Sequence, residues 1–325
     1  MEDRLMGRYL LTVLPGLAEG EKEKIRCAAH EHGFTPMFYN SPQEAADMIP
    51  KAEIIFGNDG KLADNAPSLK WLCTSTAGVN QFMNKEVFTG GQAMLTNSSG
   101  AYGVTISEHV IMILLEILRR QQDHTQIISR RDWVRNLPVR SICESRITLL
   151  GTGDIGQETA IRLRSFSPGS LVGVNRSGSN PRGLFDRIIK NEDLETILPQ
   201  TDILIMSLPG TAATDGMIGE KELAMLPDKA VVVNVGRGSV IVQSALEKEL
   251  RKGRLSAALD VFEVEPIPQE DTIWTCPNLL ITPHVAGNMT LPYTVRRIVD
   301  MFLENLDSYM EGSDLKRRVN LEKGY

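Results

Sequence analysis

The chain has 325 residues, of which 42% are hydrophobic and 23% are charged, with 41 acidic against 35 basic residues. This length is enough for two domains of ordinary size, each with its own core. The acidic excess is not that of a polyanion-binding protein, so we expect no nucleic-acid partner. The longest apolar stretch, 110–115, is far shorter than the roughly 20 residues that cross a bilayer, so we expect no membrane span.

The amino terminus and the cysteines bear on the compartment. The chain starts with Met1, Glu2, Asp3 and Arg4, which is acidic where an export signal would be basic. Cysteines occur at positions 27, 73, 143 and 276 with no C-x-x-C spacing, which predicts neither a zinc site nor a disulfide framework. We therefore expect a protein of the reducing cytoplasm.

Short apolar runs alternate with helix-like segments through the first hundred residues. Segment 18–32 has a helical pattern, and apolar runs that predict strands occupy 9–14, 37–39, 53–56, 71–74 and 93–95. This alternation predicts an α/β layer fold. Segment 106–120 follows, apolar on most of its faces, and predicts a buried helix that joins two domains.

A second α/β series begins at Arg146 and ends near Val285. Its predicted strands occupy 147–150, 171–174, 203–207, 230–234, 257–259 and 279–282. Glycine and proline mark the strand ends. The tail from 291 to 310 is again helical in period.

A glycine-rich turn opens this second series. Gly151, Gly153 and Gly156 follow the strand 147–150 and lead into a helical segment, 157–164. Three glycines at this spacing alone are weak evidence, because they also occur in tight turns. A preceding strand and a following helix favour a dinucleotide site, where backbone and helix N-terminus approach a pyrophosphate.

The second strand of the series ends on Asn175, followed by Arg176 and Ser177. A residue about 20 positions after the glycines normally receives the adenosine ribose hydroxyls. No carboxylate stands here to repel a 2′-phosphate, and Arg176 and Ser177 offer donors for one. The sequence therefore favours NADP(H), and NAD(H) remains an alternative if Arg176 only faces solvent.

Three charged residues in the last third of the chain predict a hydride-transfer site. They are Arg237 in NVGRGSV, Glu265 in DVFEVEP and His284 in ITPHVAG. A guanidinium binds a substrate carboxylate, an imidazole delivers a proton, and a neighbouring carboxylate favours the imidazolium. Singly, each could be a packing or solvated residue. His109, beside Glu108 on the apolar helix, is the other candidate histidine, and we interpret it as structural.

These residues resemble the D-isomer-specific 2-hydroxyacid dehydrogenase family over nearly the whole chain. The matching blocks are LLGTGDIGQ, MSLPGTAATDGMI, VVVNVGRGSVI, ALDVFEVEP and LLITPHVAG. The resemblance implies that Arg237, Glu265 and His284 are catalytic, that Asp260 contacts the nicotinamide carboxamide, and that Ala77 and Gly78 in the loop 74–80 receive the substrate carboxylate. The cofactor-binding residues that it implies are Gly151, Gly153, Asp154, Ile155, Gly156, Asn175, Arg176, Ser177, Leu208, Pro209, Thr214, Val235, Gly236, Asp260 and Gly287.

The resemblance also implies the architecture. A flavodoxin-like substrate domain, 1–102 plus 287–325, would carry an inserted Rossmann-type NAD(P)-binding domain, 103–286, with a doubly wound parallel sheet and the active site in the cleft. Family members are usually dimers, for which 103–124 is the expected arm, so we expect a homodimer. The turn 167–170 is longer than the family usually has, which leaves the individual 2′-phosphate contacts open.

The expected function is reduction of a small 2-oxo acid to a D-2-hydroxy acid, because the ending at 175–177 is similar to that of NADPH-linked glyoxylate and hydroxypyruvate reductases. A nucleotide-sensing corepressor of the same fold and a phosphite dehydrogenase remain alternatives. Formate dehydrogenase is disfavoured because its usual partner to the histidine is Gln, where Glu265 stands here. The pocket residues 58–61, Tyr102 and Trp133 do not specify a substrate.

Overall fold

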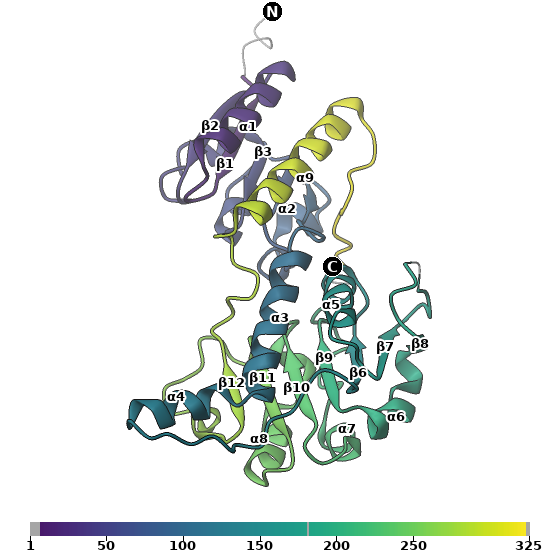
Figure 1. The fold of residues 1–325 in the computed structure, drawn as a ribbon. Helices are drawn as coiled ribbons and strands as arrows, with labels where there is room; N and C mark the ends of the chain where they lie inside the picture. The colour runs from purple at the N-terminus through teal and green to yellow at the C-terminus, as the bar shows by residue number, and fades with distance from the viewer. Residues whose placement is uncertain (1–6, 181, 323–325) are drawn as a thin grey trace, which may run out of the picture. The chain divides into compact units, whose positions relative to one another are not determined.

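The computed structural model describes residues 7–180 and 182–322, and their contacts divide the chain into two compact units (Figure 1). The first unit contains the residues up to Ala101 and those from Met289 on, and the second runs from Tyr102 to Asn288. Residues 1–6, whose acidic start bore on the expectation of no export signal, lie outside the described residues.

The first unit is built on a five-stranded parallel sheet with the order β2-β1-β3-β4-β5. This order is that of flavodoxin-like folds. The strands are β1 (Tyr9–Val13), β2 (Thr35–Tyr39), β3 (Ala52–Gly57), β4 (Trp71–Cys73) and β5 (Met94–Thr96). The helices are α1 (Glu19–Glu31), the short α2 (Glu86–Thr89) and α9 (Pro292–Glu311).

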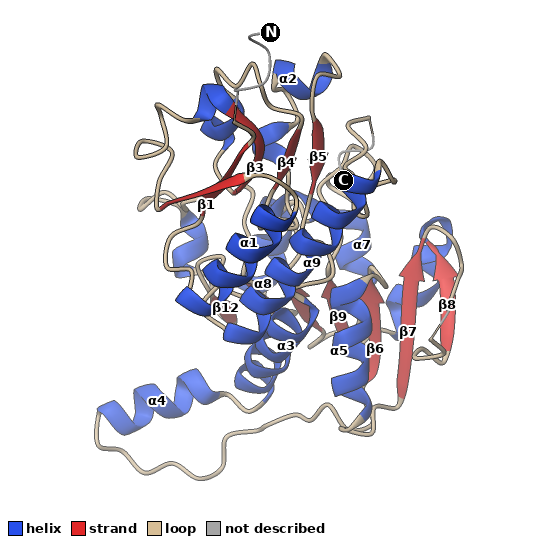
Figure 2. Cartoon of the chain, turned by 90° about the horizontal axis from the view of Figure 1, so that it is seen from above, coloured by secondary structure: helices blue, strands red, loops and turns tan. Residues whose placement is uncertain are grey.

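The carboxyl-terminal helix is held to this sheet by aromatic stacking. Phe302 of α9 stacks on Phe56 of β3 with ring centroids 4.3 Å apart, and on Trp71 of β4 at 5.3 Å. Helix α9 also contacts α1, and the two helices lie side by side (Figure 2). Burial of these large rings explains why residues from both ends of the sequence form one core.

The second unit contains a seven-stranded parallel sheet with the order β12-β11-β10-β9-β6-β7-β8. The strands are β6 (Arg146–Leu150), β7 (Ser170–Asn175), β8 (Arg187–Lys190), β9 (Ile203–Met206), β10 (Val231–Asn234), β11 (Ser256–Leu259) and β12 (Leu279–Ile281). Strand order reverses between β6 and β9, as in a doubly wound Rossmann-type sheet, so the expected α/β fold class is confirmed. The sequence analysis did not predict β8.

The helices of this unit are α3 (Gly103–Leu118), α4 (Gln121–Ser129), α5 (Asp154–Arg164), α6 (Leu194–Ile197), α7 (Glu220–Met225) and α8 (Gln243–Arg251). Helix α3 packs against α5 and β11. Most of its residues are buried or half-buried, and its exposed residues are Glu108 and Met112, of which Met112 is 45% exposed. None of the described helices is both long and apolar enough to cross a bilayer.

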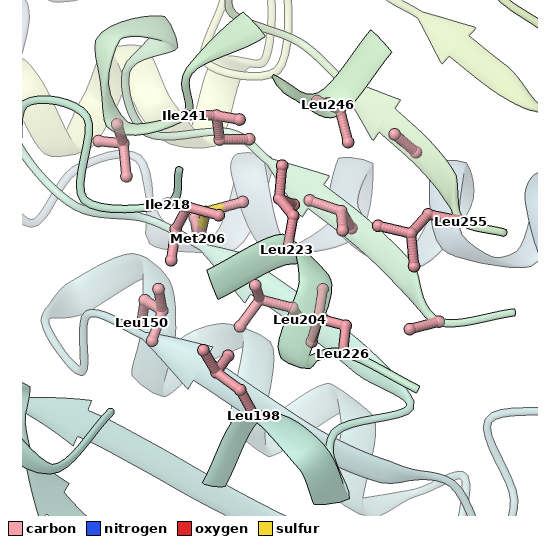
Figure 3. Close-up of a cluster of buried hydrophobic side chains, with 14 of the residues drawn as sticks. Leu150, Leu198, Leu204, Met206, Ile218, Leu223, Leu226, Ile241, Leu246 and Leu255 are labelled. Carbon is pink, nitrogen blue, oxygen red and sulfur yellow. The ribbon is translucent and has the colours of Figure 1, made fainter. Parts of the chain in front are cut away.

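The core of the second unit explains why its strands are apolar on both faces. Strands β9 and β10 are buried along their whole length, as expected for a parallel sheet with helices on both sides. Figure 3 shows one side of this core, where Leu204 and Met206 of β9 lie among side chains of the covering helices and loops, including Leu223 and Leu246. Each fully buried side chain of this kind contributes about 1.5–3 kcal/mol.

Candidate active site

Three neighbouring strands carry the residues that the sequence singled out. Strands β10, β11 and β12 are adjacent and parallel, and Arg237, Glu265 and His284 each follow the carboxyl end of one of them. Parallel strands end at the same edge of a sheet, which is where ligands bind in such folds. The fold therefore gathers residues that are far apart in sequence.

The imidazole of His284 and the carboxylate of Glu265 are in direct contact. Nδ1 of His284 lies 2.6 Å from Oε2 of Glu265, and Oε1 of Glu265 accepts a hydrogen bond from the backbone N–H of Phe262 at 2.9 Å. The carboxylate is thus held at both oxygens. The His284 side chain is 51% exposed, and among the described residues none is bonded to its Nε2. The ring is oriented by one nitrogen and presents the other outward.

The backbone of the histidine loop is strained and tightly bound. His284 has φ of +52°, in the left-handed region, and its N–H donates to the carbonyl oxygen of Asp260 at 2.9 Å. The Asp260 carboxylate, 1% exposed, accepts from the Thr282 hydroxyl at 2.6 Å and from the N–H groups of Val285 and Ala286 at 2.9 and 3.0 Å. Asp260 therefore shapes the loop, and the implied contact of this residue with the nicotinamide stays a prediction.

Arg237 lies in a loop that folds back on itself. Its Nη1 donates to the carbonyl oxygen of Gly236 at 2.7 Å, and its own carbonyl oxygen accepts from Nδ2 of Asn234 at 2.8 Å. Burial lowers the pKa of Arg237, and the negative charge of Glu265 opposes this shift. A Cβ on Gly210 would lie 3.2 Å from Cγ of Arg237, so the arginine stem packs closely on that loop. The guanidinium remains charged, since an arginine side chain is protonated at any physiological pH.

Gly238 shows how closely the arginine loop lies against the loop that carries the glutamate. A Cβ on Gly238 would lie 1.9 Å from the backbone carbonyl group of Phe262. Real side chains essentially never approach so closely, and only glycine fits without movement of the backbone. Phe262 also donates its N–H to Glu265, so this one residue contacts both the arginine loop and the glutamate.

The turn between β6 and α5 has the shape that a pyrophosphate needs. Gly151 has φ of +96°, and a Cβ on Gly156 would lie 2.1 Å from the carbonyl oxygen of Gly151. A Cβ on Gly153, the N-cap of α5, would meet nothing within 4 Å, and no side chain caps that helix end. The N–H groups of an uncapped helix end bind anions, so these residues fit a dinucleotide. Asp154 and Ile155 form the first turn of α5.

The loops after β9 and β10 form a second close contact. A Cβ on Gly236 would lie 2.6 Å from the carbonyl oxygen of Leu208, and Leu208 and Val235 are both buried. The Thr214 hydroxyl donates to the carbonyl oxygen of Pro209 at 2.6 Å. The hydroxyl of Thr214 thus helps to shape the loop on which the resemblance placed cofactor contacts.

Asp154 and Gly287, which are also expected at the cofactor, lie against helix α3. A Cβ on Gly103 would lie 2.5 Å from Oδ2 of Asp154, and a Cβ on Gly287 would lie 3.3 Å from Cδ1 of Ile106. The structure thus brings the start of α5 and the end of the histidine loop against this one helix. Their roles toward a cofactor stay predictions.

The residues after β7 form a compact turn around Asn175. Its Oδ1 accepts from the N–H of Gly178 at 2.7 Å, and its Nδ2 donates to the Thr152 hydroxyl at 2.6 Å and to the Ser179 carbonyl at 3.0 Å. The amide of Asn175 therefore organises the turn. Ser177 is exposed, and so is Arg176.

Lys190 is a cation near this turn that the sequence analysis missed. It pairs with Asn175 in the register of β7 and β8, and its Cγ lies 3.9 Å from where a Cβ on Gly178 would be. Its Nζ is 3.5 Å from the carboxylate of Glu192. The signal was hidden because β8 itself was not predicted.

The loop expected to bind the substrate carboxylate lies in the first unit. Asn97 donates from Nδ2 to the carbonyl oxygen of Ala77 at 3.0 Å, and the Thr76 hydroxyl donates to the carbonyl oxygen of Gly78 at 2.9 Å. Oδ1 of Asn58 accepts from Thr74 and Gln81, at 3.0 and 3.1 Å, and lies 2.9 Å from the Thr76 hydroxyl oxygen. Side chains thus fix both carbonyl groups of the loop, which sets the direction of its N–H groups.

Comparison with known proteins assigns the family. The model of the D-isomer specific 2-hydroxyacid dehydrogenase, NAD binding domain, matches residues 111–286. The chain belongs to this family. It is an NAD(P)-dependent oxidoreductase, and the resemblance stated from the sequence motifs is confirmed.

Similar proteins support the same assignment over a larger part of the chain. The glyoxylate/hydroxypyruvate reductase B of Pectobacterium atrosepticum is 30% identical over 249 residues, which cover 74% of this chain and 77% of that one. A D-isomer specific 2-hydroxyacid dehydrogenase family protein from Aeromonas salmonicida has a TM-score of 0.84 at 28% identity, covering 97% of this chain and 99% of that one. The NADPH-dependent glyoxylate/hydroxypyruvate reductase of Sinorhizobium meliloti, solved with NADP and sulfate, has the same fold, with a TM-score of 0.80 at 24% identity and coverage of 98% and 100%.

Proposed function

We propose that this dehydrogenase is an NADPH-preferring reductase that converts small 2-oxo acids, of the glyoxylate and hydroxypyruvate kind, into D-2-hydroxy acids. The observation that carries the proposal is the 2.6 Å contact between Nδ1 of His284 and Oε2 of Glu265. It orients an imidazole whose other nitrogen is available to a ligand. An acid of this kind is what reduction of a carbonyl group requires.

A dinucleotide held at the turn around Gly151 and Gly156 would supply the hydride for the carbonyl carbon. His284 donates the proton from Nε2 to the carbonyl oxygen, so the oxygen becomes the hydroxyl of the product. Glu265 binds Nδ1–H throughout and stabilises the charged form of the ring before the transfer. The ring is neutral after the transfer and is recharged from solvent, which its 51% exposure allows.

Arg237 binds the substrate carboxylate in this proposal. A guanidinium offers two parallel hydrogen bonds that match a carboxylate, which the point charge of a lysine does not. Arg237→Lys should therefore fail to restore activity although the charge is kept. We keep the prediction that Ala77 and Gly78 also receive this carboxylate, and with it the assignment of the substrate role to the first unit.

The cofactor preference rests on the turn after β7. Arg176, Ser177 and Lys190 offer donors for a 2′-phosphate, and the ending Asn175-Arg176-Ser177 contains no carboxylate to repel it. A charge-assisted hydrogen bond is worth about 1.5–3 kcal/mol, or about ten- to a hundredfold in affinity. Arg176→Ala should weaken NADPH by that factor and leave NADH nearly unchanged. Arg187, at the opposite end of β8, gives a charge-matched control as Arg187→Ala.

The decisive experiment is a steady-state panel of 2-oxo acids against NADPH and NADH. We expect the highest kcat/KM with NADPH and with glyoxylate or hydroxypyruvate, which are named for the Pectobacterium relative. Equal kcat/KM for the two cofactors would contradict the NADPH preference. Absence of turnover with all 2-oxo acids would favour the corepressor alternative. Oxidation of phosphite would favour the phosphite dehydrogenase alternative.

We also propose that the protein is a homodimer that uses α3, α4 and the segment after them. Helix α4 projects from the end of α3 in both views (Figures 1 and 2). Large apolar side chains are exposed along this region, namely Met112 at 45%, Ile128 at 57%, Trp133 at 81%, Val134 at 48% and Val139 at 44%. Such a set is typical of an interface. Light scattering of wild type and Ile128→Asp tests it, and a monomeric wild type would contradict it.

A cytoplasmic location also stays a prediction.

A further inference from the structure

A second histidine lies behind the catalytic loop. His109, on α3, has a side chain that is only 11% exposed, and its Nε2 is 3.1 Å from the Thr282 hydroxyl oxygen. That hydroxyl is in turn 2.6 Å from Oδ1 of Asp260, and Nε2 of His109 is 3.7 Å from the same carboxylate oxygen. The three side chains form a chain of contacts from α3 to the carboxylate that binds the His284 loop.

The direction of the hydrogen bonds in this chain follows from their chemistry. A carboxylate only accepts, so the single hydroxyl proton of Thr282 is donated to Asp260. The hydroxyl oxygen is then free to accept, and His109 donates to it from Nε2–H. Burial lowers the pKa of His109, against the opposing charges of Asp260 and Glu116, which favours the neutral ring, and the contact with Thr282 places a proton on Nε2. The contacts therefore select one tautomer.

Asp260 connects the contacts between His109 and Thr282 to the backbone of the catalytic histidine. The same carboxylate accepts from the N–H groups of Val285 and Ala286, and the carbonyl oxygen of Asp260 accepts from the N–H of His284. His284 has φ of +52°, a conformation that persists only where the surroundings impose it. Thr282, at the start of the loop, and the residues after His284 are thus bound to one group.

We propose that His109 is a positioning residue for His284, acting through Thr282 and Asp260 to hold the loop 282–286, in which His284 has its left-handed backbone. The inference rests on the proposed function, because it assumes that His284 delivers the proton. The sequence shows no partner for His109 and favours a structural role for it. Its contact with Thr282 assigns it a task at the catalytic loop.

Substitutions at Thr282 test the chain of contacts without removal of a large side chain. Thr282→Val keeps the shape and removes the hydroxyl, whereas Thr282→Ser keeps the hydroxyl. A catalytic group displaced by about 1 Å costs about a hundredfold in rate. We expect Thr282→Val to lower kcat about ten- to a hundredfold, with a smaller change in KM, and Thr282→Ser to stay near wild type.

His109→Leu should behave like Thr282→Val, and the double variant should lose no more than either single one, because both break the same chain. Glu108→Gln is the control on the same helix, since that side chain is 63% exposed. Additive losses in the double variant would overturn the proposal.

A second double-mutant cycle shows whether the contacts of His109, Thr282 and Asp260 act through His284. In the His284→Ala background, Thr282→Val should have no further effect on the residual kcat. The same fold-loss in both backgrounds would overturn the proposal, because the chain would then act elsewhere. Near-normal kcat of His284→Ala alone would refute the proposed function itself, which is a separate result.

Hydrogen exchange gives a readout that does not depend on turnover. The N–H groups of Val285 and Ala286 are bound to Asp260, so a peptide that spans 282–288 reports on the loop. Its amides should exchange faster in Thr282→Val and in His109→Leu than in wild type, while Thr282→Ser and Glu108→Gln should match wild type. Unchanged exchange in the first two variants would overturn the proposal.

Discussion

Replacement of Glu265 by glutamine tests the central contact of the site. The carboxylate accepts two N–H donors, Nδ1 of His284 at 2.6 Å and the Phe262 backbone at 2.9 Å. The amide of a glutamine has one oxygen, so whichever way it turns, its NH₂ group meets one of the two donors. If the oxygen keeps Phe262, the NH₂ faces Nδ1, which must then be unprotonated to accept. The charged imidazole is no longer stabilised.

The size of the effect follows from the exposure of the pair. A hydrogen bond between charged groups contributes about 1.5–3 kcal/mol. The side chains are 51% and 34% exposed, so solvent screening favours the lower end of that range. We expect kcat to fall about tenfold in Glu265→Gln, since about 1.4 kcal/mol corresponds to a factor of ten.

The assay is steady-state reduction of a saturating 2-oxo acid, with the exposed Glu270→Gln as control. His284→Ala should lose more, about 10²- to 10⁴-fold, because it removes the acid itself. Glu265→Gln should add nothing in that background. Wild-type kcat in Glu265→Gln, or an equal loss with and without His284, would refute the reasoning.

Three further outcomes are expected. Gly238→Ala forces its Cβ to within 1.9 Å of the Phe262 carbonyl group unless the backbone moves, so it should cost about 1–3 kcal/mol in urea unfolding and lower kcat as well; unchanged values would contradict the close contact. Tyr309→Phe removes a hydroxyl that donates to Glu53 at 2.8 Å, and should cost about 1–2 kcal/mol by the same measurement; an unchanged free energy of unfolding would contradict this contribution. Burial lowers the pKa of His109 below 6.5, so near and below that pH the unfolded chain binds more protons than the folded one. The free energy of unfolding should therefore fall as the pH drops below about 6.5. His109→Gln should flatten this pH dependence, and an identical slope in the variant would exclude His109 as its source.

The sequence predicts the elements whose signal is local. Fully apolar runs at β9 and β10 and the glycines before α5 identify a nucleotide-type sheet, because buried parallel strands have no polar face. Strand β8 was not predicted from the sequence. Its four residues are exposed or half-exposed at the sheet edge, and they have neither strong alternation nor a long apolar run. Helix α3 is apolar on most of its faces, but its composition does not show that it packs on α5 and β11.

The site divides in the same way. Arg237, Glu265 and His284 could be named from the chemistry of each short block, and the structure brings Glu265 and His284 into contact. The contact of His109 with Thr282 joins residues 173 positions apart, and no local pattern encodes it. Nor does spacing show that the amide of Asn175 is used inside its own turn. Such contacts follow from tertiary packing alone.

One short segment after β11 contacts the loops of all three residues of the proposed site. The carboxylate of Asp260 binds the loop of the histidine, and the N–H of Phe262 binds Glu265. The carbonyl group of Phe262 also lies against Gly238, the residue next to the arginine. Because residues 260–262 contact the His284 loop, Glu265 and the neighbour of Arg237, we expect a displacement of this segment to move the three proposed catalytic residues together. Their mutual distances, on which the rate depends most steeply, are then less sensitive to motion of the loops than three independent loops would allow.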